Sequence, residues 1–213
     1  MKYTAVIVAA GKSERFGSAV NKLLYKLSDG SLVIDKALEP FREDKDCTQI
    51  VLVTNPETID YLAKNRATGK EMYCLGGETR SDSVFNGLKA VKEKIVLVHD
   101  GARCYLKNED LNNLKKAMKT ERAAILTKPI VDTIKVVSEG YIVKTIDRNM
   151  LNGAQTPQAF YADELMDCYK KARKEGFIPT DEASVIEKYS DIKIRCVISK
   201  NYNEKITTID DIK

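Results

Sequence analysis

The first residues whose types and spacing could do chemistry lie in a short loop near the start of the chain. An apolar run of strand length, from Ala5 to Ala10, ends at Gly11, and the polar loop behind it carries Arg15, Gly17 and Lys22. Unpaired backbone N–H groups and fixed cations converge in such a loop, where together they can bind an anion. The segment therefore predicts either a phosphate-handling loop or, without chemistry, a tight turn with solvated basic side chains.

Two well-known phosphate loops do not fit this segment. A P-loop ending at Gly11-Lys12-Ser13 needs another glycine where Val6 stands, and a dinucleotide fingerprint starting at Gly11 would meet Ser13 and Phe16 instead of glycines. What remains is A-A-G-x-S-x-R-F-G followed by a lysine. This pattern is similar to the N-terminal signature of nucleotidyltransferases, which join a nucleoside triphosphate to a phosphorylated sugar or polyol.

A second candidate segment follows the apolar run from Ile95 to Val98 and reads His99-Asp100-Gly101-Ala102-Arg103. A carboxylate at the end of a buried strand can hold Mg²⁺ while triphosphate oxygens and water fill the other positions. Asp100 is therefore the candidate metal ligand, or else it caps the next turn. We expect His99 to pack or hydrogen-bond at the strand end, because nucleotidyl transfer needs charge neutralisation more than proton abstraction.

Glycines and arginines mark further candidate positions. Gly76 and Gly77 precede Arg80 and would let the backbone approach a ligand closely, while Ser81 or Asp82 can cap the helix that follows. Capping alone would also explain these polar residues. Arginine is the rarer cation here, with nine of the 35 basic residues, and its planar fork matches phosphate. Four arginines fall in turns after apolar runs: Arg15, Arg80, Arg103 and Arg148.

The elements that must position these side chains alternate along the chain. Strand-type runs extend from Ala5 to Ala10, Ile50 to Thr54, Ile95 to His99, Ala123 to Leu126 and Ile194 to Ile198, and helix-like patterns from Asp35 to Phe41, Glu57 to Lys64, Ser81 to Lys92 and Asn108 to Thr120. Strands that are apolar throughout, alternating with helices, predict an α/β, Rossmann-like fold with a mostly parallel sheet and helices on both faces. The loops after Ala10, Thr54 and His99 should face one site beyond the strand ends.

One segment departs from this alternation. Residues from Asp132 to Arg148 read as two β-branched runs around Ser138-Glu139-Gly140, which predicts a β-hairpin. An isolated two-stranded ribbon is marginal in water, so we expect a projecting arm at about 132–149 that packs on a partner subunit. The hairpin could instead form an antiparallel edge of the main sheet. Since no linker or repeat appears, residues 1–213 are expected to form a single domain.

The composition narrows the class of protein. The five cysteines form no C-x-x-C pair and the chain has one histidine, so neither a zinc site nor a disulfide framework is indicated. The net charge of +4 is modest and the lysines are dispersed, which does not favour nucleic-acid binding. No apolar run approaches the roughly 18 residues of a membrane span, and no export signal appears, so we expect a cytoplasmic protein.

Seven short segments together resemble one family along nearly the whole chain. They are AAGKSERFG with Lys22, GGETRSDSVFNGL, VLVHDGAR, DTIK, DRNMLNGAQTPQAF, TDEAS and NEKIT. In this order and spacing, the chain resembles the 2-C-methyl-D-erythritol 4-phosphate cytidylyltransferases of the non-mevalonate isoprenoid pathway. The resemblance implies in-line attack of a substrate phosphate oxygen on the α-phosphorus of CTP, with pyrophosphate leaving and no covalent enzyme intermediate.

The resemblance also implies roles at the nucleotide. Catalytic cations around the α-phosphorus would be Arg15, Lys22 and Lys205, and Asp100 would hold Mg²⁺. The residues that match the part of the family binding CTP are Ala9, Ala10, Gly11, Gly17, Gly77, Arg80, Ser83 and Ala102.

The hairpin acquires a role from the same resemblance. It would be the arm through which subunits of a homodimer embrace, so that Thr133 and Arg148 contact the methylerythritol phosphate held by the neighbour. Arg103, Thr156 and Thr180 match further substrate-side residues. No nucleic-acid or membrane partner is implied.

The chain departs from the family pattern at a few positions, which bear on efficiency more than on the type of reaction. The catalytic lysine is flanked by Asn21 and Leu23 instead of Pro and Gln, and Cys104 replaces a proline. Losing prolines weakens loop preorganisation by about 0.4–1 kcal/mol per site, with no loss of charge. The nearest alternative function is a ribitol 5-phosphate cytidylyltransferase. Ala102 favours the methylerythritol enzyme over this alternative, because ribitol 5-phosphate cytidylyltransferases often have valine at that position. The other alternative is a nucleotide-binding regulator that lacks catalysis.

Overall fold

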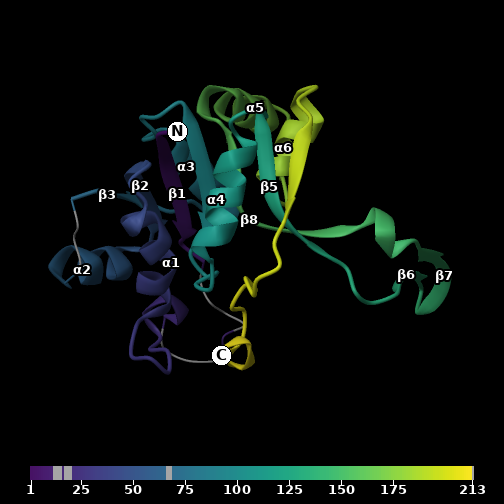
Figure 1. Cartoon of the computed structure of the whole chain (residues 1–213), viewed down its shortest axis with the longest axis horizontal. Coiled ribbons are helices and arrows are strands. Elements are labelled where there is room, and N and C mark those ends of the chain that lie inside the picture. The colour runs from purple at the N-terminus through teal and green to yellow at the C-terminus, as the bar shows by residue number, and fades with distance from the viewer. Residues whose placement is uncertain (12–15, 17–20, 66–68, 213) are drawn as a thin grey trace.

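A seven-stranded sheet runs through the middle of the molecule, with helices on both of its faces (Figure 1). The structure is a computed structural model that describes residues 1–11, 16, 21–65 and 69–212. In spatial order the strands are β3 (Glu71–Leu75), β2 (Cys47–Thr54), β1 (Tyr3–Ala9), β4 (Ile95–Asp100), β8 (Asn152–Tyr161), β5 (Ala123–Pro129) and β9 (Ile194–Ile198). The mostly parallel α/β fold is therefore confirmed.

Alternate side chains along the strands pack into two separate hydrophobic cores, one on each face of the sheet. On β1, Ala5 and Ile7 face one core while Val6 faces the other. The first core contains apolar residues of α1 (Val33–Glu43), α2 (Pro56–Asn65) and α4 (Asn108–Ala117), and the second those of α3 (Arg80–Leu88), α5 (Ala162–Lys174) and α6 (Glu182–Tyr189). Burial on both faces is why these strands read as continuous apolar runs.

The sheet contains one central strand that the sequence did not reveal. β8 pairs antiparallel with both β4 and β5, whereas β1 pairs parallel with β2 and β4. Its residues include Gly153, Pro157 and three buried polar side chains, Gln155, Thr156 and Gln158, a composition atypical of a buried strand. Their hydrogen bonds to neighbouring elements make that burial possible.

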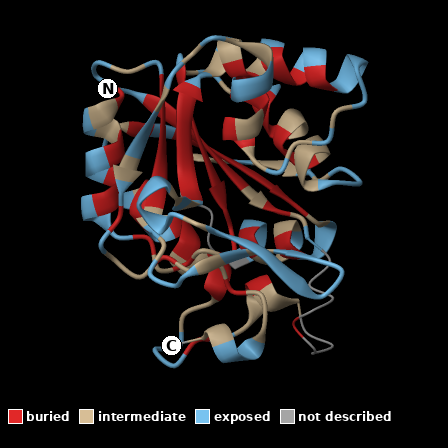
Figure 2. Ribbon diagram, turned by 90° about the vertical axis from the view of Figure 1, so that its right-hand side faces the viewer, coloured by how far each residue is buried: buried red, intermediate tan, exposed pale blue. Residues whose placement is uncertain are grey.

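The predicted hairpin is present as a separate two-stranded sheet. It consists of β6 (Ile134–Ser138) and β7 (Tyr141–Ile146), and a 3₁₀ turn, η3 (Arg148–Met150), follows it. Figure 1 shows this arm projecting from the body, and most of its residues are exposed (Figure 2). Positive φ angles at Glu139 and Gly140, 51° and 84°, match a two-residue hairpin turn. The arm is not an edge of the main sheet.

Within the described residues, no helix combines the length and the apolar character required to cross a bilayer.

Candidate active site

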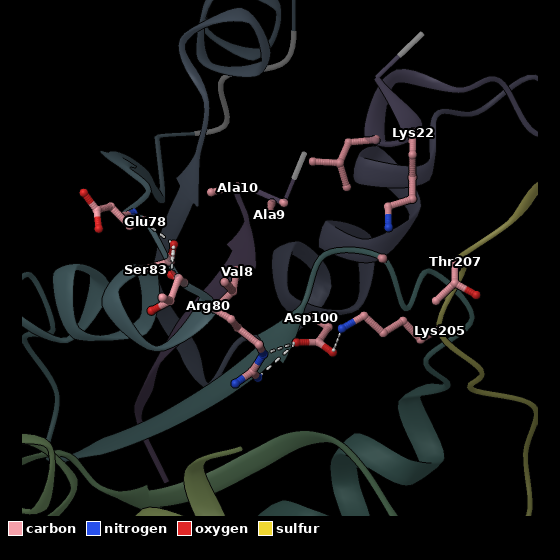
Figure 3. A pocket seen from close by; sticks show the side chains of 15 residues that line it. Val8, Ala9, Ala10, Lys22, Glu78, Arg80, Ser83, Asp100, Lys205 and Thr207 are labelled. Atoms are coloured by element: carbon pink, nitrogen blue, oxygen red, sulfur yellow. Dashed lines mark hydrogen bonds and ion pairs between the residues drawn. The ribbon is translucent and has the colours of Figure 1, made fainter. Parts of the chain in front are cut away.

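A cavity of about 920 Å³ opens beyond the carboxyl ends of β1, β3 and β4 (Figure 3). Its lining residues are Val8, Ala9, Ala10, Gly11, Lys22, Leu23, Gly77, Glu78, Thr79, Arg80, Ser83, Asp100, Ala102, Lys205 and Thr207. The expectation that the loop after Thr54 faces this cavity is wrong. The loop after β3, a strand that the sequence did not reveal, lines it instead, while Thr54 Oγ1 donates to the carbonyl of Ala9 at 2.8 Å.

Glycines allow the strand ends around the cavity to approach one another. A Cβ atom at Gly76 would lie 2.2 Å from the Cβ of Ala10, and one at Gly101 would lie 2.9 Å from the Cβ of Ala9. Both separations are too short for a side chain. The two glycines therefore keep the loops after β3 and β4 against the end of β1.

The loop after β3 is stiffened from the start of α3. Of the two predicted capping residues, Ser81 is wrong and Asp82 does contribute: Thr79 is the N-cap, its hydroxyl accepts from Asp82 N–H at 3.0 Å, and the Asp82 carboxylate accepts in return from Thr79 N–H. Ser83 Oγ accepts from the N–H of Gly77 at 3.0 Å and donates to the carbonyl of Thr79. Ser83 thus fixes the backbone of a cavity-lining loop.

Asp100 is the acidic centre of the cavity and is only 6% exposed. Arg80 Nε donates to Oδ1 at 3.1 Å and Lys205 Nζ donates to Oδ2 at 2.9 Å, while Arg103 Nε lies 3.8 Å from Oδ2. Burial raises the pKa of Asp100, but the Arg80 and Lys205 cations outweigh it and hold that pKa well below its usual value. The carboxylate is therefore ionised at neutral pH.

The backbone of Asp100 is hydrogen-bonded to the neighbouring strand β8. Its N–H donates to Thr156 Oγ1 at 3.0 Å, and the same oxygen lies 2.9 Å from Nδ1 of His99. His99 Nε2 in turn lies 3.0 Å from the carbonyl of Arg103. Desolvation lowers the pKa of buried His99 to about 4, so the ring is neutral and bonded through both nitrogens, as predicted for a structural histidine.

The segment from Asn203 to Thr207 brings Lys205 to the cavity. Ile206 N–H donates to the carbonyl of Ala102 at 2.9 Å, and Lys22 Nζ donates to the carbonyl of Ile206 at 3.1 Å. Arg103 Nη1 donates to the carbonyl of Asn203 at 2.7 Å. Lys22, Ala102 and Arg103, all predicted site residues, thus hold the segment that carries Lys205. As a result, the amines of Lys22 and Lys205 lie on one side of the cavity (Figure 3).

Several residues of the site were not predicted from the sequence: Val8, Leu23, Glu78, Thr79 and Thr207 line the cavity, and Glu182 contacts the lining residue Arg80. Glu182, at the start of α6, accepts from Arg80 Nη1 and Nη2 at 2.8 and 3.1 Å and from Tyr169 Oη at 3.0 Å. In the sequence Glu182 lies within the TDEAS segment, where it reads as an acidic residue in a helix's first turn. The sequence offered one indication of this contact: Arg80 is an arginine in a lysine-rich chain, and an arginine often pairs with a carboxylate through both of its terminal nitrogens.

Several predicted residues do not line the cavity within this chain. Thr133, Arg148 and Thr180 are exposed, and Arg148 donates to the carbonyl of Val131 at the base of the arm. Thr156 is buried, and its hydroxyl is engaged beneath Asp100. Arg15 and Gly17 lie outside the described residues, and all of these substrate or nucleotide roles stay predictions.

The residues that depart from the family pattern have packing roles. Asn21 Oδ1 accepts from Leu23 N–H at 3.1 Å and caps the 3₁₀ turn η2 (Lys22–Leu24), while Asn21 Nδ2 donates to Thr58 Oγ1 at 3.0 Å. Leu23 and Cys104 are buried in the first core. These contacts orient the backbone around Lys22 in place of the usual proline.

Asp100 is a carboxylate of the cavity that could bind Mg²⁺. Across the described ranges, no three Asp, Glu, His or Cys side chains gather as a metal site. Mg²⁺ in nucleotide enzymes takes one or two carboxylates and completes its shell with phosphate oxygens and water. Asp100, a carboxylate lining the cavity, fits an ion that arrives with a triphosphate.

Comparisons with known proteins point to one family of enzymes. The model of the family described as 2-C-methyl-D-erythritol 4-phosphate cytidylyltransferase matches residues 3–213. Proteins of that name from Bacillus mycoides (strain KBAB4) and Geobacillus kaustophilus (strain HTA426) are 36% and 37% identical, covering 99% and 100% of this chain and 94% of theirs.

Solved structures give the same result. The crystal structure of 4-diphosphocytidyl-2C-methyl-D-erythritol synthase from Anaerococcus prevotii DSM 20548 has a TM-score of 0.88 at 29% identity, covering 99% of this chain and 94% of that one. The Francisella tularensis 2-C-methyl-D-erythritol 4-phosphate cytidylyltransferase has a TM-score of 0.82 at 31% identity, covering 98% and 95%.

Proposed function

Because the chain belongs to the 2-C-methyl-D-erythritol 4-phosphate cytidylyltransferase family, we propose that it joins CTP to 2-C-methyl-D-erythritol 4-phosphate and releases pyrophosphate. The observation that carries this proposal is the convergence of Lys22, Arg80 and Lys205 with one buried carboxylate, Asp100, on a cavity large enough for a nucleotide. The negative charge of a triphosphate would be matched by Lys22 and Lys205, whose side chains line the cavity.

The nucleotide would lie across the ends of β1 and β3. Ala9, Ala10 and Gly11 line the cavity, and the contact between Gly76 and Ala10 keeps the loop at Gly77 close to it. Cavity walls built from main chain and small side chains leave room for a base and ribose while offering N–H groups and carbonyls for recognition.

The reacting phosphorus would lie beside the two lysines. Lys22 and Lys205 reach the same side of the cavity because Lys22 is bonded to the segment that carries Lys205. Their ammonium groups would stabilise the charge that builds up on the α-phosphate as the polyol phosphate oxygen attacks in line with the leaving pyrophosphate. Arg15 would supply a third positive charge beside the same phosphate.

Asp100 would hold Mg²⁺ when the nucleotide binds. Bound there, the ion would neutralise charge on the triphosphate and help to orient it. Lys205 contacts Asp100 in this structure, so the same side chain would be near the α-phosphate once the nucleotide is in place.

The arm supports assembly as a homodimer. Tyr141, Ile142 and Val143 are 78%, 66% and 61% exposed on β7, a clustering of large apolar side chains that association would remove from water. A second copy packed on the arm would bring Thr133 and Arg148 to the neighbour's polyol phosphate. The single domain and the cytoplasmic location expected from the sequence also stay predictions.

A direct assay tests the proposal. Purified protein is incubated with CTP, Mg²⁺ and one polyol phosphate, and pyrophosphate release is followed. We expect turnover with 2-C-methyl-D-erythritol 4-phosphate. Turnover with ribitol 5-phosphate alone would establish the alternative cytidylyltransferase, and CTP binding without turnover on either would indicate a regulator.

A further inference from the structure

Arg80 lies between two carboxylates that come from distant parts of the chain. On one side its Nε and Nη2 lie 3.1 and 3.0 Å from Oδ1 of Asp100. On the other side Nη1 and Nη2 form the two-pronged contact with Glu182. A guanidinium held bidentately has a fixed plane as well as a fixed position.

Glu182 cannot itself be a ligand of the cavity. Its side chain is 0% exposed, and it also accepts a hydrogen bond from the buried hydroxyl of Tyr169. Burying a charge is unfavourable unless its partners offset the lost hydration, and a buried ion pair is often no more stabilising than apolar residues of the same volume. A fully buried carboxylate behind a site arginine is therefore better explained by orientation than by stability.

The two cations that contact Asp100 differ in how they are held. Arg80 is anchored from behind by Glu182, whereas the side chain of Lys205 is 37% exposed and lies on the segment near the C-terminus. When an anionic ligand enters the cavity, Lys205 can exchange Asp100 for a phosphate oxygen. Arg80 cannot do so without abandoning Glu182.

We infer that Glu182 is a positioning residue: it fixes Arg80 on Oδ1 of Asp100 and thereby keeps the Oδ2 side for the incoming nucleotide and its ion. This inference rests on the proposed function. Without the charge of Glu182, the guanidinium would be free to pair side-on with both oxygens of Asp100, the geometry that arginine prefers with a single carboxylate. Arg80 would then compete with the nucleotide complex for Asp100.

The test compares the wild type with Glu182→Gln, which keeps the size of the side chain and removes its charge. Calorimetric titration with Mg·CTP, without any polyol phosphate, needs no turnover. We expect Mg·CTP affinity to fall about 10-fold and kcat for pyrophosphate release to fall about 10- to 100-fold, the range for residues that orient a ligand-binding group. Adding Glu182→Gln to Arg80→Lys should cause little further loss, because Glu182 acts through Arg80.

A matched control is available at the other end of the sheet. Glu71, whose side chain is 1% exposed, accepts from Arg42 Nε at 2.8 Å at the amino end of β3. Glu71→Gln should lower the melting temperature without changing Mg·CTP affinity or kcat. If Glu182→Gln behaves like Glu71→Gln, or if its effect adds fully to that of Arg80→Lys, the positioning role is wrong.

Two further outcomes are separable. If the wild type binds Mg·CTP but turns over neither polyol phosphate, the proposed function fails while the calorimetric comparison still decides the role of Glu182. A wild type that binds no Mg·CTP contradicts both. Should Glu182→Gln not fold, Tyr169→Phe, which removes one hydrogen bond to Glu182, replaces it, and an affinity loss of about threefold is then expected, against none for a merely structural contact.

Discussion

Lys205 and Asp100 stand 105 positions apart in the chain, yet the Nζ of the first lies 2.9 Å from Oδ2 of the second. The contact joins the segment near the C-terminus to the end of a central strand. It forms because that segment docks on the loop after β4 through Ala102 and Arg103. A cation is thereby held at the cavity.

Removal of this cation should impair chemistry more than folding. Lys205→Ala is expected to lower kcat for pyrophosphate release about 100-fold, since it removes one preorganised charge from the reacting phosphate. Steady-state kinetics measure the effect, and Lys200→Ala, an exposed lysine shortly before the same segment, is the control. An unchanged kcat in Lys205→Ala would show that the lysine does not contact the reacting group.

Close contact between loops makes Gly76 a sensitive position. Gly76→Ala would put its methyl group 2.2 Å from the Cβ of Ala10, so the loops must separate. We expect a loss of about 1–3 kcal/mol in unfolding free energy and a higher KM for CTP. Denaturant titration measures the first, and Gly153→Ala, whose Cβ would lie 3.6 Å from its nearest neighbour, should cost far less. Equal stabilities of the two variants would refute the packing argument.

Apolar residues of the arm should decide the oligomeric state. Ile142→Asp with Val143→Asp places charge on an exposed apolar strand, and we expect the protein to change from dimer to monomer because an interface does not tolerate unpaired buried charge. Sedimentation velocity measures the mass. Met72→Asp, which puts a charge in place of an exposed apolar side chain on β3, an edge strand of the main sheet, should leave the dimer intact. A monomeric wild type would count against the arm as an interface.

The arm also predicts complementation between defective subunits. Lys22→Ala and Arg148→Ala subunits should each be nearly inactive alone, while mixing them should restore part of the activity. In a hybrid dimer one site would combine intact Lys22 of one chain with intact Arg148 of its neighbour. Pyrophosphate release after mixing and re-equilibration checks this, and activity no higher than the sum of the separate variants would place Arg148 in its own chain's site.

Buried His99 predicts a pH dependence of stability. Its pKa is lowered from 6.5 to about 4 in the folded protein, so between these values the unfolded chain binds a proton that the folded chain does not. Stability must then fall as pH falls through this window, by about 3 kcal/mol in total. Urea unfolding in EDTA should show this slope, and His99→Gln should flatten it. Parallel slopes for the two proteins would mean that His99 titrates normally.

The frame of the fold followed from sequence periodicity because most strands are buried on both faces. β9 was predicted with its observed bounds, and the predicted strands at β1, β2, β4 and β5 overlap the observed ones. Periodicity failed at β8, where the buried polar residues are satisfied by partners far away in the chain, such as Asp181 for Gln158. No local pattern encodes such a partner.

The site divides in the same way. Lys22, Arg80, Asp100 and Lys205 could be selected because loop position and motif order mark them, and they do line one cavity. Glu182 lies in the TDEAS segment but could not be given a role from it, because its importance comes from complete burial behind Arg80, which the packing of α5 with α3 and α6 creates. The part of the site that orients other residues is thus less visible in sequence than the part that faces the ligand.

The central claim is the choice of polyol phosphate, and a competition experiment tests it most directly. Equal concentrations of 2-C-methyl-D-erythritol 4-phosphate and ribitol 5-phosphate are offered together with CTP and Mg²⁺, and the two cytidine diphosphate products are quantified by mass spectrometry. Their initial ratio equals the ratio of kcat/KM values. We predict that the methylerythritol product accumulates almost alone, whereas a mixture dominated by the ribitol product would contradict the assignment.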